Sequence, residues 1–380
     1  MLSTVVLTIE GGASVPAPVR RARDRQHRSG KPVVAVTGAG GGMGAAVFAH
    51  LAASPRLGAV VGVDTVVTAP SESAGEVSWR QFDPADPRLA QALDGVQAVA
   101  HLAVELAPDP DRAGQRQRNT RRAQTVITAA FAAGARRVTL VTSAMVYGAL
   151  PDNPVPLTDD APLRAVPEAS VLGDLLEIER MADRASRTHR GLTVTVLRPA
   201  IVLGLDGDGG MASLVEAPRL LHVRGTTPHW QFCHVLDLAG AVERALLGEV
   251  TGPANVASDG WLSQEEVEDI SGRRSLDLPE RVAVATAERL HRLGITPAPP
   301  SELAYLMNPW VVDTARLKQA GWSPTYSNAE ALRSHLTDRG RSRLTRPGAR
   351  GATAAAGAAV ALVGTAALVR RARRRRSGRG

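Results

Sequence analysis

A glycine-rich segment constrains the fold of this chain more than any other feature. Residues 33–36 (VVAV) form a short apolar run of the kind found in buried parallel strands, and they lead directly into TGAGGGMG at 37–44. Gly38, Gly41 and Gly44 have the spacing G-x-x-G-x-x-G. The first glycine permits a tight turn, the second lets backbone N–H groups approach a pyrophosphate, and the third allows close helix–strand packing. Because a helix N-terminus favours negative charge, the segment predicts a dinucleotide phosphate-binding loop.

An aspartate at the end of the second apolar run predicts the type of dinucleotide. Residues 59–63 (AVVGV) end at Asp64, twenty residues after Gly44. A carboxylate there can accept hydrogen bonds from the adenosine ribose hydroxyls, and it would repel a 2′-phosphate. Thr65 and Val66 supply no arginine to offset that repulsion. The pattern therefore favours NAD over NADP, and the alternative is a solvated loop aspartate.

The alternation of apolar runs with alanine-rich segments predicts an α/β fold. Further strands are expected at 77–82, 98–102, 138–142 and 193–197, with helices at 119–134 and 172–189. This order is typical of a Rossmann-type, doubly wound parallel sheet with a smaller C-terminal substrate lobe. We expect a disordered basic leader (1–30), an NAD-binding Rossmann domain (31–200), a substrate lobe (201–335) whose segment 230–247 returns to the Rossmann half, a basic linker (336–350), a membrane helix (351–369) and an arginine-rich tail (370–380).

The charge of the chain is concentrated at its ends. The whole chain is formally +8, but seven of the last eleven residues are arginine, and residues 32–338 sum to about −8. An acidic globular part argues against nucleic acid as a partner of the fold. The single cysteine, Cys233, excludes an intramolecular disulfide and suits a reducing, cytoplasmic location. The nine histidines show no metal-ligand spacing, so no metal site is expected.

An ordered series of short segments resembles the extended short-chain dehydrogenases, the NAD-dependent epimerase/dehydratase family. The overall pattern is most similar to an atypical actinobacterial branch of that family. The segments that carry the resemblance cover about 300 residues: FDP at 82–84, HLA at 101–103, NT at 119–120, VTSAMVYG at 141–148, LRP at 197–199, FCHVLDLA at 232–239, NVA at 255–257 and VDT…GWSP at 312–324.

The resemblance implies roles for particular residues. Asp83 would contact adenine, residues 101–103 would lie beside the cofactor, and Ser143 would orient the oxygen of a nucleotide-sugar or related hydroxylated substrate. Family members often dimerise through two helices of the Rossmann half, so a homodimer is expected by analogy. The predicted cofactor-binding residues are Gly38, Gly41, Gly42, Met43, Gly44, Asp64, Asp83, His101, Leu102 and Ala103, and Ser143 is the predicted catalytic residue.

The catalytic Tyr-x-x-x-Lys pair of the family is missing. The tyrosine acts as acid and base and the lysine lowers its pKa, on a helix about 25 residues after the serine. One register places Ala169 and Gly173 at these positions, and the next places Ser170 and Asp174. Either another acid/base acts here, or hydride transfer has been lost and the protein is an NAD-binding sensor or scaffold. The candidate substitutes by proximity are Asp174, Glu177, Glu168 and His101.

Two further predictions concern a substrate and a membrane. Arg198 is expected to meet a phosphate or sugar oxygen of the substrate, and the alternative is a salt bridge at the strand end. Residues 351–369 contain 19 residues without a charge, close to the ~20 needed to cross a bilayer, with arginines on both sides. Because this run is mostly alanine, it predicts membrane association through 351–380 either as a span or as an interfacial helix on anionic lipid, and the alternative is a free basic tail.

Overall fold

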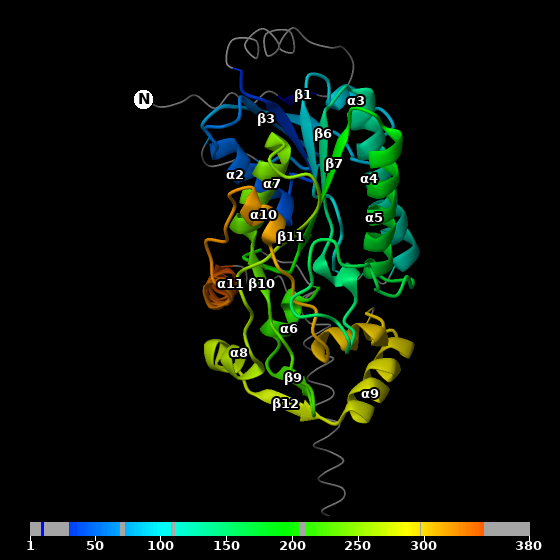
Figure 1. The fold of residues 1–380 in the computed structure, drawn as a ribbon, viewed down its shortest axis with the longest axis vertical. Coiled ribbons are helices and arrows are strands. Elements are labelled where there is room, and N and C mark those ends of the chain that lie inside the picture. Colours follow the sequence, from blue (N-terminus) through cyan, green and yellow to red (C-terminus); the bar gives the residue numbers. More distant parts are fainter. Residues whose placement is uncertain are drawn as a thin grey trace, which may run out of the picture.

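The computed structural model describes residues 9–10, 30–68, 73–107, 109, 111–205, 210–296 and 298–345. Its centre is an eight-stranded sheet in which every pairing is parallel (Figure 1). The central strands are apolar and buried on both faces, as a parallel sheet requires. The predicted Rossmann-type α/β class is confirmed. In spatial order the strands are β1 (Ile9–Glu10), β4 (Glu76–Gln81), β3 (Ala59–Asp64), β2 (Val33–Thr37), β5 (Ala98–His101), β6 (Arg137–Val141), β7 (Thr193–Pro199) and β11 (Gly252–Val256).

Helices cover both faces of the sheet. On one face α2 (Gly42–Ala53) packs beside α7 (Val235–Leu247), and on the other α4 (Arg112–Ala132) packs beside α3 (Leu89–Ala92) and α5 (Val171–Thr188) (Figure 1). The helix α7 comes from the C-terminal half of the chain and also contacts β5, β6 and β7. The Rossmann half is therefore completed by segments that follow residue 230.

The direction of winding reverses between β2 and β5. From β2 the chain continues to β3 on one side, and β5 lies on the other side, followed by β6 and β7. Ligands of doubly wound sheets bind at the carboxyl ends of the strands at such a switch point. The glycine segment follows β2 and residues 101–103 follow β5, so both meet there. They approach so closely that a Cβ on Gly38 would lie 2.6 Å from the backbone nitrogen of Ala103.

The smaller lobe lies beyond one end of the sheet (Figure 1). It contains two parallel strand pairs, β8 (Ile201–Leu203) with β10 (Phe232–His234) and β9 (Leu220–Val223) with β12 (Ser275–Leu278). Its shorter connections include the 3-10 helix η2 (Pro300–Leu306), which contacts both α9 (Glu280–Arg292) and β9. Its helices are α6 (Ala212–Glu216), α8 (Gln264–Ser271), α9 (Glu280–Arg292) and η2 (Pro300–Leu306); α10 (Ala315–Gln319) then packs on β11, and α11 (Asn328–Thr345) packs on α8 and β10.

Two boundaries differ from the sequence predictions. Ile9–Glu10, inside the expected disordered leader, pairs in parallel with Trp79 and Arg80 and forms the edge strand β1. The basic linker expected from residue 336 begins as helix, because α11 runs to Thr345 and its Arg339 pairs with the buried carboxylate of Glu216 at 2.8 Å. The expected membrane segment 351–369 lies outside the described residues, and within them no helix combines the length and apolarity that a bilayer span needs.

The third glycine of the loop is expected to be essential for stability, whereas the second is not. A Cβ on Gly44 would lie 1.8 Å from the carbonyl oxygen of Gly38, so Gly44→Ala should lower the free energy of unfolding by about 1–3 kcal/mol, measured by denaturant unfolding. Gly41→Ala is the matched control, because Gly41 has extended backbone angles and no atom within 4 Å of the added carbon. Equal stability of the two variants would contradict this assignment.

Candidate functional site

The glycine loop fits a pyrophosphate at the start of α2. Gly41 caps this helix with extended backbone and no side-chain hydrogen bond, so the first N–H groups of α2 have no capping side chain. The space beside Gly41 is open, whereas a Cβ on Gly38 would lie 2.6 Å from the nitrogen of Ala103 and one on Gly44 would lie 1.8 Å from the carbonyl oxygen of Gly38. This difference fits the separate roles that the spacing predicts, and those roles stay predictions. The structure leaves room for an anion at Gly41 and Gly42, where the helix N-terminus favours it.

Asp64 lies against the same loop. Its Oδ2 accepts a hydrogen bond from the Gly40 backbone N–H at 2.9 Å, and its Oδ1 accepts one from the N–H of Thr65 at 2.7 Å. Oδ1 also accepts from the Thr65 hydroxyl at 3.2 Å and from the N–H of Val66 at 3.3 Å, so these bonds fix the carboxylate at the end of β3. Oδ2 has a single protein donor and keeps a lone pair for a ribose hydroxyl. Asp83, the predicted adenine contact, is more exposed and accepts from the N–H of Ala85 at 2.8 Å. Both residues lie on the side of the loop where the adenosine end of NAD is expected.

His101 is buried at the end of β5 and stays neutral. Its Nδ1 lies 2.8 Å from the hydroxyl of Thr37, and its Nε2 has no hydrogen-bond partner among the described residues. Burial, assisted by the positive charge of Arg122, lowers the pKa of His101 from its ordinary value of 6.5 to about 3. A histidine that holds no proton near pH 7 and does not reach the cavity is a poor substitute for the missing catalytic acid.

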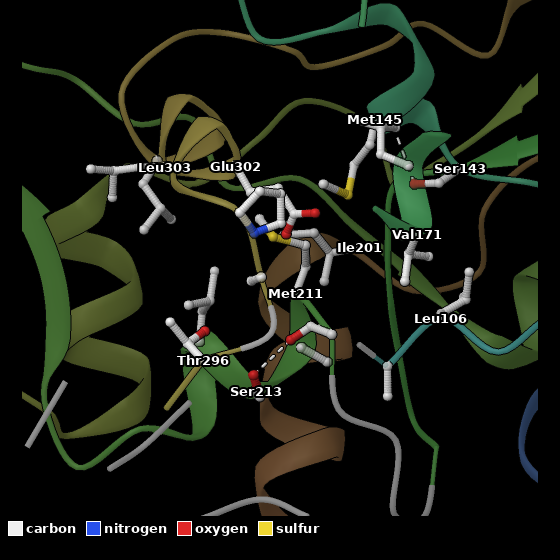
Figure 2. A pocket seen from close by; sticks show the side chains of 18 of the residues that line it. Leu106, Ser143, Met145, Val171, Ile201, Met211, Ser213, Thr296, Glu302 and Leu303 are labelled. Atoms are coloured by element: carbon white, nitrogen blue, oxygen red, sulfur yellow. Dashed lines mark hydrogen bonds between the residues drawn. The ribbon is translucent and has the colours of Figure 1, made fainter. Parts of the chain in front are cut away.

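Ser143 lies at the mouth of a cavity that joins the two halves of the protein. It follows β6 by two residues and caps the 3-10 helix η1 (Ala144–Tyr147), where its Oγ accepts from the backbone N–H of Met145 at 3.2 Å. Its hydroxyl proton is therefore free to be donated to a ligand oxygen. The cavity has a volume of about 1080 Å³ and extends from the glycine loop past Ser143 into the smaller lobe. Figure 2 shows lining residues of this cavity between Ser143 and the smaller lobe. Of the predicted site residues it is lined by Gly41, Gly42, Met43, Leu102 and Ser143.

The segment around the start of α5, where the family carries its tyrosine and lysine, has other residues and a different local structure in this chain. Ala169 is exposed and precedes α5, whose N-cap is Ser170, with its Oγ 3.3 Å from the N–H of Gly173. A Cβ on Gly173 would lie 2.0 Å from the carbonyl oxygen of Glu168. The residues of α5 that line the cavity are apolar: Val171, Leu172 and Leu175. Neither sequence register therefore supplies a proton donor here.

Asp174, a candidate acid/base, is hydrogen-bonded to side chains of a neighbouring helix. Its carboxylate is fully buried and accepts from Arg112 at 3.0 and 3.1 Å, from Arg116 at 3.4 Å and from the amide of Asn119 at 3.1 Å. These three residues belong to α4, so Asp174 joins α4 to α5. Of the other candidates, Glu177 pairs with Arg180 on the same helix at 3.1 Å and does not line the cavity.

Sequence reasoning missed Glu302, which projects into the cavity from η2 (Figure 2). No hydrogen bond or ion pair joins its carboxyl to another described residue. Burial and the nearby charge of Glu168 raise the pKa of Glu302 to about 7, although Arg112 opposes the shift. Glu168, another predicted candidate, accepts a hydrogen bond from the Ser301 hydroxyl. No sequence motif marks Glu302, because it follows a proline-rich stretch far along the chain from Ser143.

Arg198 makes contacts that favour the salt-bridge alternative. Its guanidinium donates to both carboxylate oxygens of Glu179, at 2.9 and 2.8 Å, and to the hydroxyl of Tyr147 at 2.8 Å. Arg198 is buried and does not line the cavity. Its binding to substrate stays a prediction without a structural contact to support it, since its donors already have protein acceptors.

Restoring the family pair is expected to fail at one of its two positions. Gly173→Lys should lower the free energy of unfolding by about 1–3 kcal/mol, because any Cβ at residue 173 collides with the backbone of Glu168. Ala169→Tyr is the matched variant and should be tolerated, because this residue is exposed and outside the helix. Thermal unfolding of both variants tests the prediction, and a fully stable Gly173→Lys protein would contradict it.

The buried histidine should make the protein sensitive to acid. The folded state takes up the His101 proton only near pH 3 and the unfolded state near pH 6.5, so the unfolded state binds more protons between these values. The free energy of unfolding should therefore fall by about 1.4 kcal/mol per pH unit as the pH drops through this window. Denaturant unfolding of His101→Asn should show a shallower slope than the wild-type protein, with His189→Asn as the control for loss of a histidine elsewhere. Identical slopes for wild type and His101→Asn would exclude this residue as the cause.

Comparisons with known proteins agree with this geometry. The NAD dependent epimerase/dehydratase family model matches residues 34–257, more than half of the chain. An uncharacterized protein of Mycobacterium tuberculosis, Rv0501, is 28% identical over 333 residues, covering 85% of this chain and 88% of the relative. A Streptomyces 3-diazoavenalumate denitrifying reductase is 36% identical over 141 residues, covering 35% of this chain and 44% of the relative.

A solved structure shares the fold at low sequence identity. The NAD-bound dTDP-glucose 4,6-dehydratase of Streptomyces venezuelae, a double mutant, superposes with a TM-score of 0.62 at 19% identity, covering 83% of this chain and 99% of the other. The family is NAD-dependent and this neighbour carries NAD, so the prediction of NAD as cofactor is confirmed at the level of the family. The chain belongs to the NAD dependent epimerase/dehydratase family.

Proposed function

We propose that this protein binds NAD and carries out hydride transfer at a small metabolite held beside Ser143, without the tyrosine–lysine proton relay of its family. The observation that carries the proposal is the single cavity that connects the glycine loop, Ser143 and the smaller lobe. A dinucleotide lying along the switch point would bring its reactive end toward Ser143. The second ligand would then occupy the part of the cavity that extends into the smaller lobe.

Each part of this chain has a task in the proposal. The N-terminus of α2 binds the pyrophosphate, Asp64 binds the adenosine ribose, and Ser143 donates a hydrogen bond to the oxygen of the second ligand. Val171, Leu172 and Leu175 keep water from the reacting carbon, which strengthens every electrostatic interaction nearby. Bound NAD supplies the hydride acceptor or donor.

The missing relay favours reactions that need no proton from a side chain. The name of the Streptomyces relative describes a reductase that removes nitrogen from a diazo compound. In a reduction of that type hydride forms the new C–H bond, the carbon–nitrogen bond breaks, and N₂ leaves with its bonding electrons, so no side-chain acid is required. Reductive replacement of a leaving group is therefore a reaction class that this site could support with the residues it has.

Two other functions are consistent with the family. A nucleotide-sugar epimerase or dehydratase is suggested by the solved neighbour, a dTDP-glucose 4,6-dehydratase. This chain lacks the acid/base pair for that chemistry, and the cavity wall at α5 is apolar. A catalytically reduced NAD-binding sensor or scaffold needs only the cofactor loop and a ligand pocket. A protein that binds NAD and a metabolite with no turnover would be such a sensor.

NAD binding should depend on Asp64 in a direction that can be measured. Asp64→Arg should weaken NAD binding by about 10- to 100-fold, because it removes charge-assisted hydrogen bonds to the ribose, and it should improve NADP binding relative to NAD. Isothermal titration with both dinucleotides tests this expectation. Asp183→Arg is the matched charge reversal, since Asp183 is exposed on α5 and pairs only with Arg187 at 2.7 Å among the contacts described.

Two outcomes would contradict the proposal. Unchanged NAD affinity in Asp64→Arg, with NAD bound by the wild type, would remove Asp64 from the cofactor site. Epimerisation or dehydration of UDP-glucose or dTDP-glucose by the NAD-loaded wild type would show that a proton relay survives, and the search for its acid/base would then return to the candidates described above.

A further inference from the structure

We propose that the part of the cavity in the smaller lobe binds an uncharged, predominantly apolar molecule, and that Glu302 meets the polar group of this ligand. This ligand class rests on the function proposed above and deepens it, because it names what lies beyond Ser143. It differs from the nucleotide sugars, which carry a diphosphate.

The walls of this part of the cavity are mostly apolar, and their polar side chains are those of Ser213, Thr286, His291, Thr296, Glu302 and His335. They come from α9, from the paired strands β9 and β12, from α6 with the residue before it, and from η2, so all sides belong to the smaller lobe. Burial of apolar ligand surface is the main source of affinity that such walls can provide. The apolar residues that line this part are Met211, Ala212, Leu214, Leu221, Leu276, Leu278, Ala283, Ala287, Leu290, Ile295, Leu303 and Leu306.

The charged side chains of the lining do not offer a site for a diphosphate. Arg112 is the only arginine or lysine among the described lining residues, and its guanidinium is bound to Asp174 and Gln115. His335 lies 3.0 Å from the carboxylate of Glu216. Of the acidic lining residues, Glu105 pairs with Arg118 and Arg122, and Asp109 pairs with Arg118. Glu302 has no charged partner among the described residues, and its carboxylate, where ionised, repels an anionic ligand. A nucleoside diphosphate would therefore find no unpaired arginine or lysine among the described lining residues.

Glu302 is held where it can meet a ligand. Its helix η2 is fixed to the active-site serine segment by Tyr305, whose hydroxyl donates to the carbonyl oxygen of Met145 at 2.6 Å. Residues three apart in a 3-10 helix lie on the same side, so Glu302 lies on the side of η2 that Tyr305 fixes to η1. Of these two residues, Glu302 lines the cavity. In Figure 2 the Glu302 carboxyl points into the cavity near Ile201. With no partner of its own among the described residues, this carboxyl is a polar group available to a ligand.

The neighbours of Glu302 give its charge a pH dependence. Burial is the main cause that raises the pKa of Glu302 to about 7. The charge of Glu168, from the segment before α5, raises this pKa further, whereas the charge of Arg112 on α4 lowers it. The other titratable groups around this part of the cavity are Tyr305 on the same helix, His291 of α9, whose Nδ1 lies 3.2 Å from the carbonyl oxygen of Thr296, and His335 of α11, whose Nε2 lies 3.0 Å from the Glu216 carboxylate. An apolar ligand removes further water from Glu302, so it should bind better to the neutral form, below the pKa.

A matched pair of probes tests the ligand class. 2-Naphthol and 2-naphthoate share one apolar ring system and differ in charge near neutral pH. The NAD-saturated protein should bind 2-naphthol at least tenfold more tightly than 2-naphthoate, measured by fluorescence titration. Ala287→Trp places a large side chain of α9 in the part of the cavity in the smaller lobe and should weaken 2-naphthol binding at least tenfold. Ala285→Trp is the control and should leave the binding unchanged, because Ala285 is exposed on the same helix and does not line the cavity.

The pH dependence assigns the role of Glu302. From pH 6 to pH 8 the affinity of the wild type for 2-naphthol should fall about tenfold, as expected for a group that ionises near 7, and Glu302→Gln should bind equally at both pH values. Equal binding of the two probes, equal effects of the two tryptophans, or an unchanged pH profile in Glu302→Gln would each overturn the proposal. NAD binding without any 2-naphthol binding would refute this inference alone, whereas 2-naphthol binding without NAD binding would refute the proposed function alone.

Discussion

The buried ion pair between Glu179 and Arg198 holds the site together. Glu179 lies on α5 and Arg198 on β7, and their two hydrogen bonds join the helix to the strand beside the edge strand β11. Glu179 also accepts a hydrogen bond from Thr142 at 2.7 Å, directly before Ser143. Burial of two charges carries a desolvation cost that only good geometry offsets, and removal of one partner from such a pair typically costs about 3–5 kcal/mol. The position of Ser143 therefore depends on a charge pair that never reaches the ligand.

The same pair extends its influence to the second half of the chain. Arg198 donates to the hydroxyl of Tyr147, and that hydroxyl donates to the side chain of Asn255 on β11 at 2.8 Å. The backbone N–H of Asn255 in turn donates to the Asp159 carboxylate at 2.6 Å. A tyrosine four residues after Ser143 is thus used for structure, and burial raises its pKa further away from the range of a useful acid. The retained V-Y-G segment reflects packing, while the catalytic tyrosine position has become alanine or serine.

Local sequence was sufficient for the cofactor loop but not for the rest of the site. The glycines, Asp64 and the strand ends could be predicted because their roles depend on neighbours within one strand–turn–helix unit or on the shared edge of a parallel sheet. The partners of Asp174 lie more than fifty residues away on α4, and the side-chain partners of Arg198 lie on α5 and η1. Glu302 could not be predicted because its place in the cavity depends on how η2 packs against η1. Contacts between segments far apart in the sequence decide which carboxylate is buried, paired or free. A periodic sequence pattern does not predict such contacts.

The order of the sheet has a consequence for how the chain is made. The strand β11 pairs with β7, and α7 packs on α2, although these partners are separated by about 50 and about 190 residues. During synthesis from the N-terminus, the glycine loop and its helix emerge long before α7 can cover them. The side of α2 that faces α7, where His50 and Ser54 contact Glu243, therefore stays uncovered by α7 until about residue 247 has been made. The cofactor-binding half can thus reach its final packing only after about two thirds of the chain has been made, and a chaperone that shields α2 in the interval would have about half of the chain's synthesis in which to act.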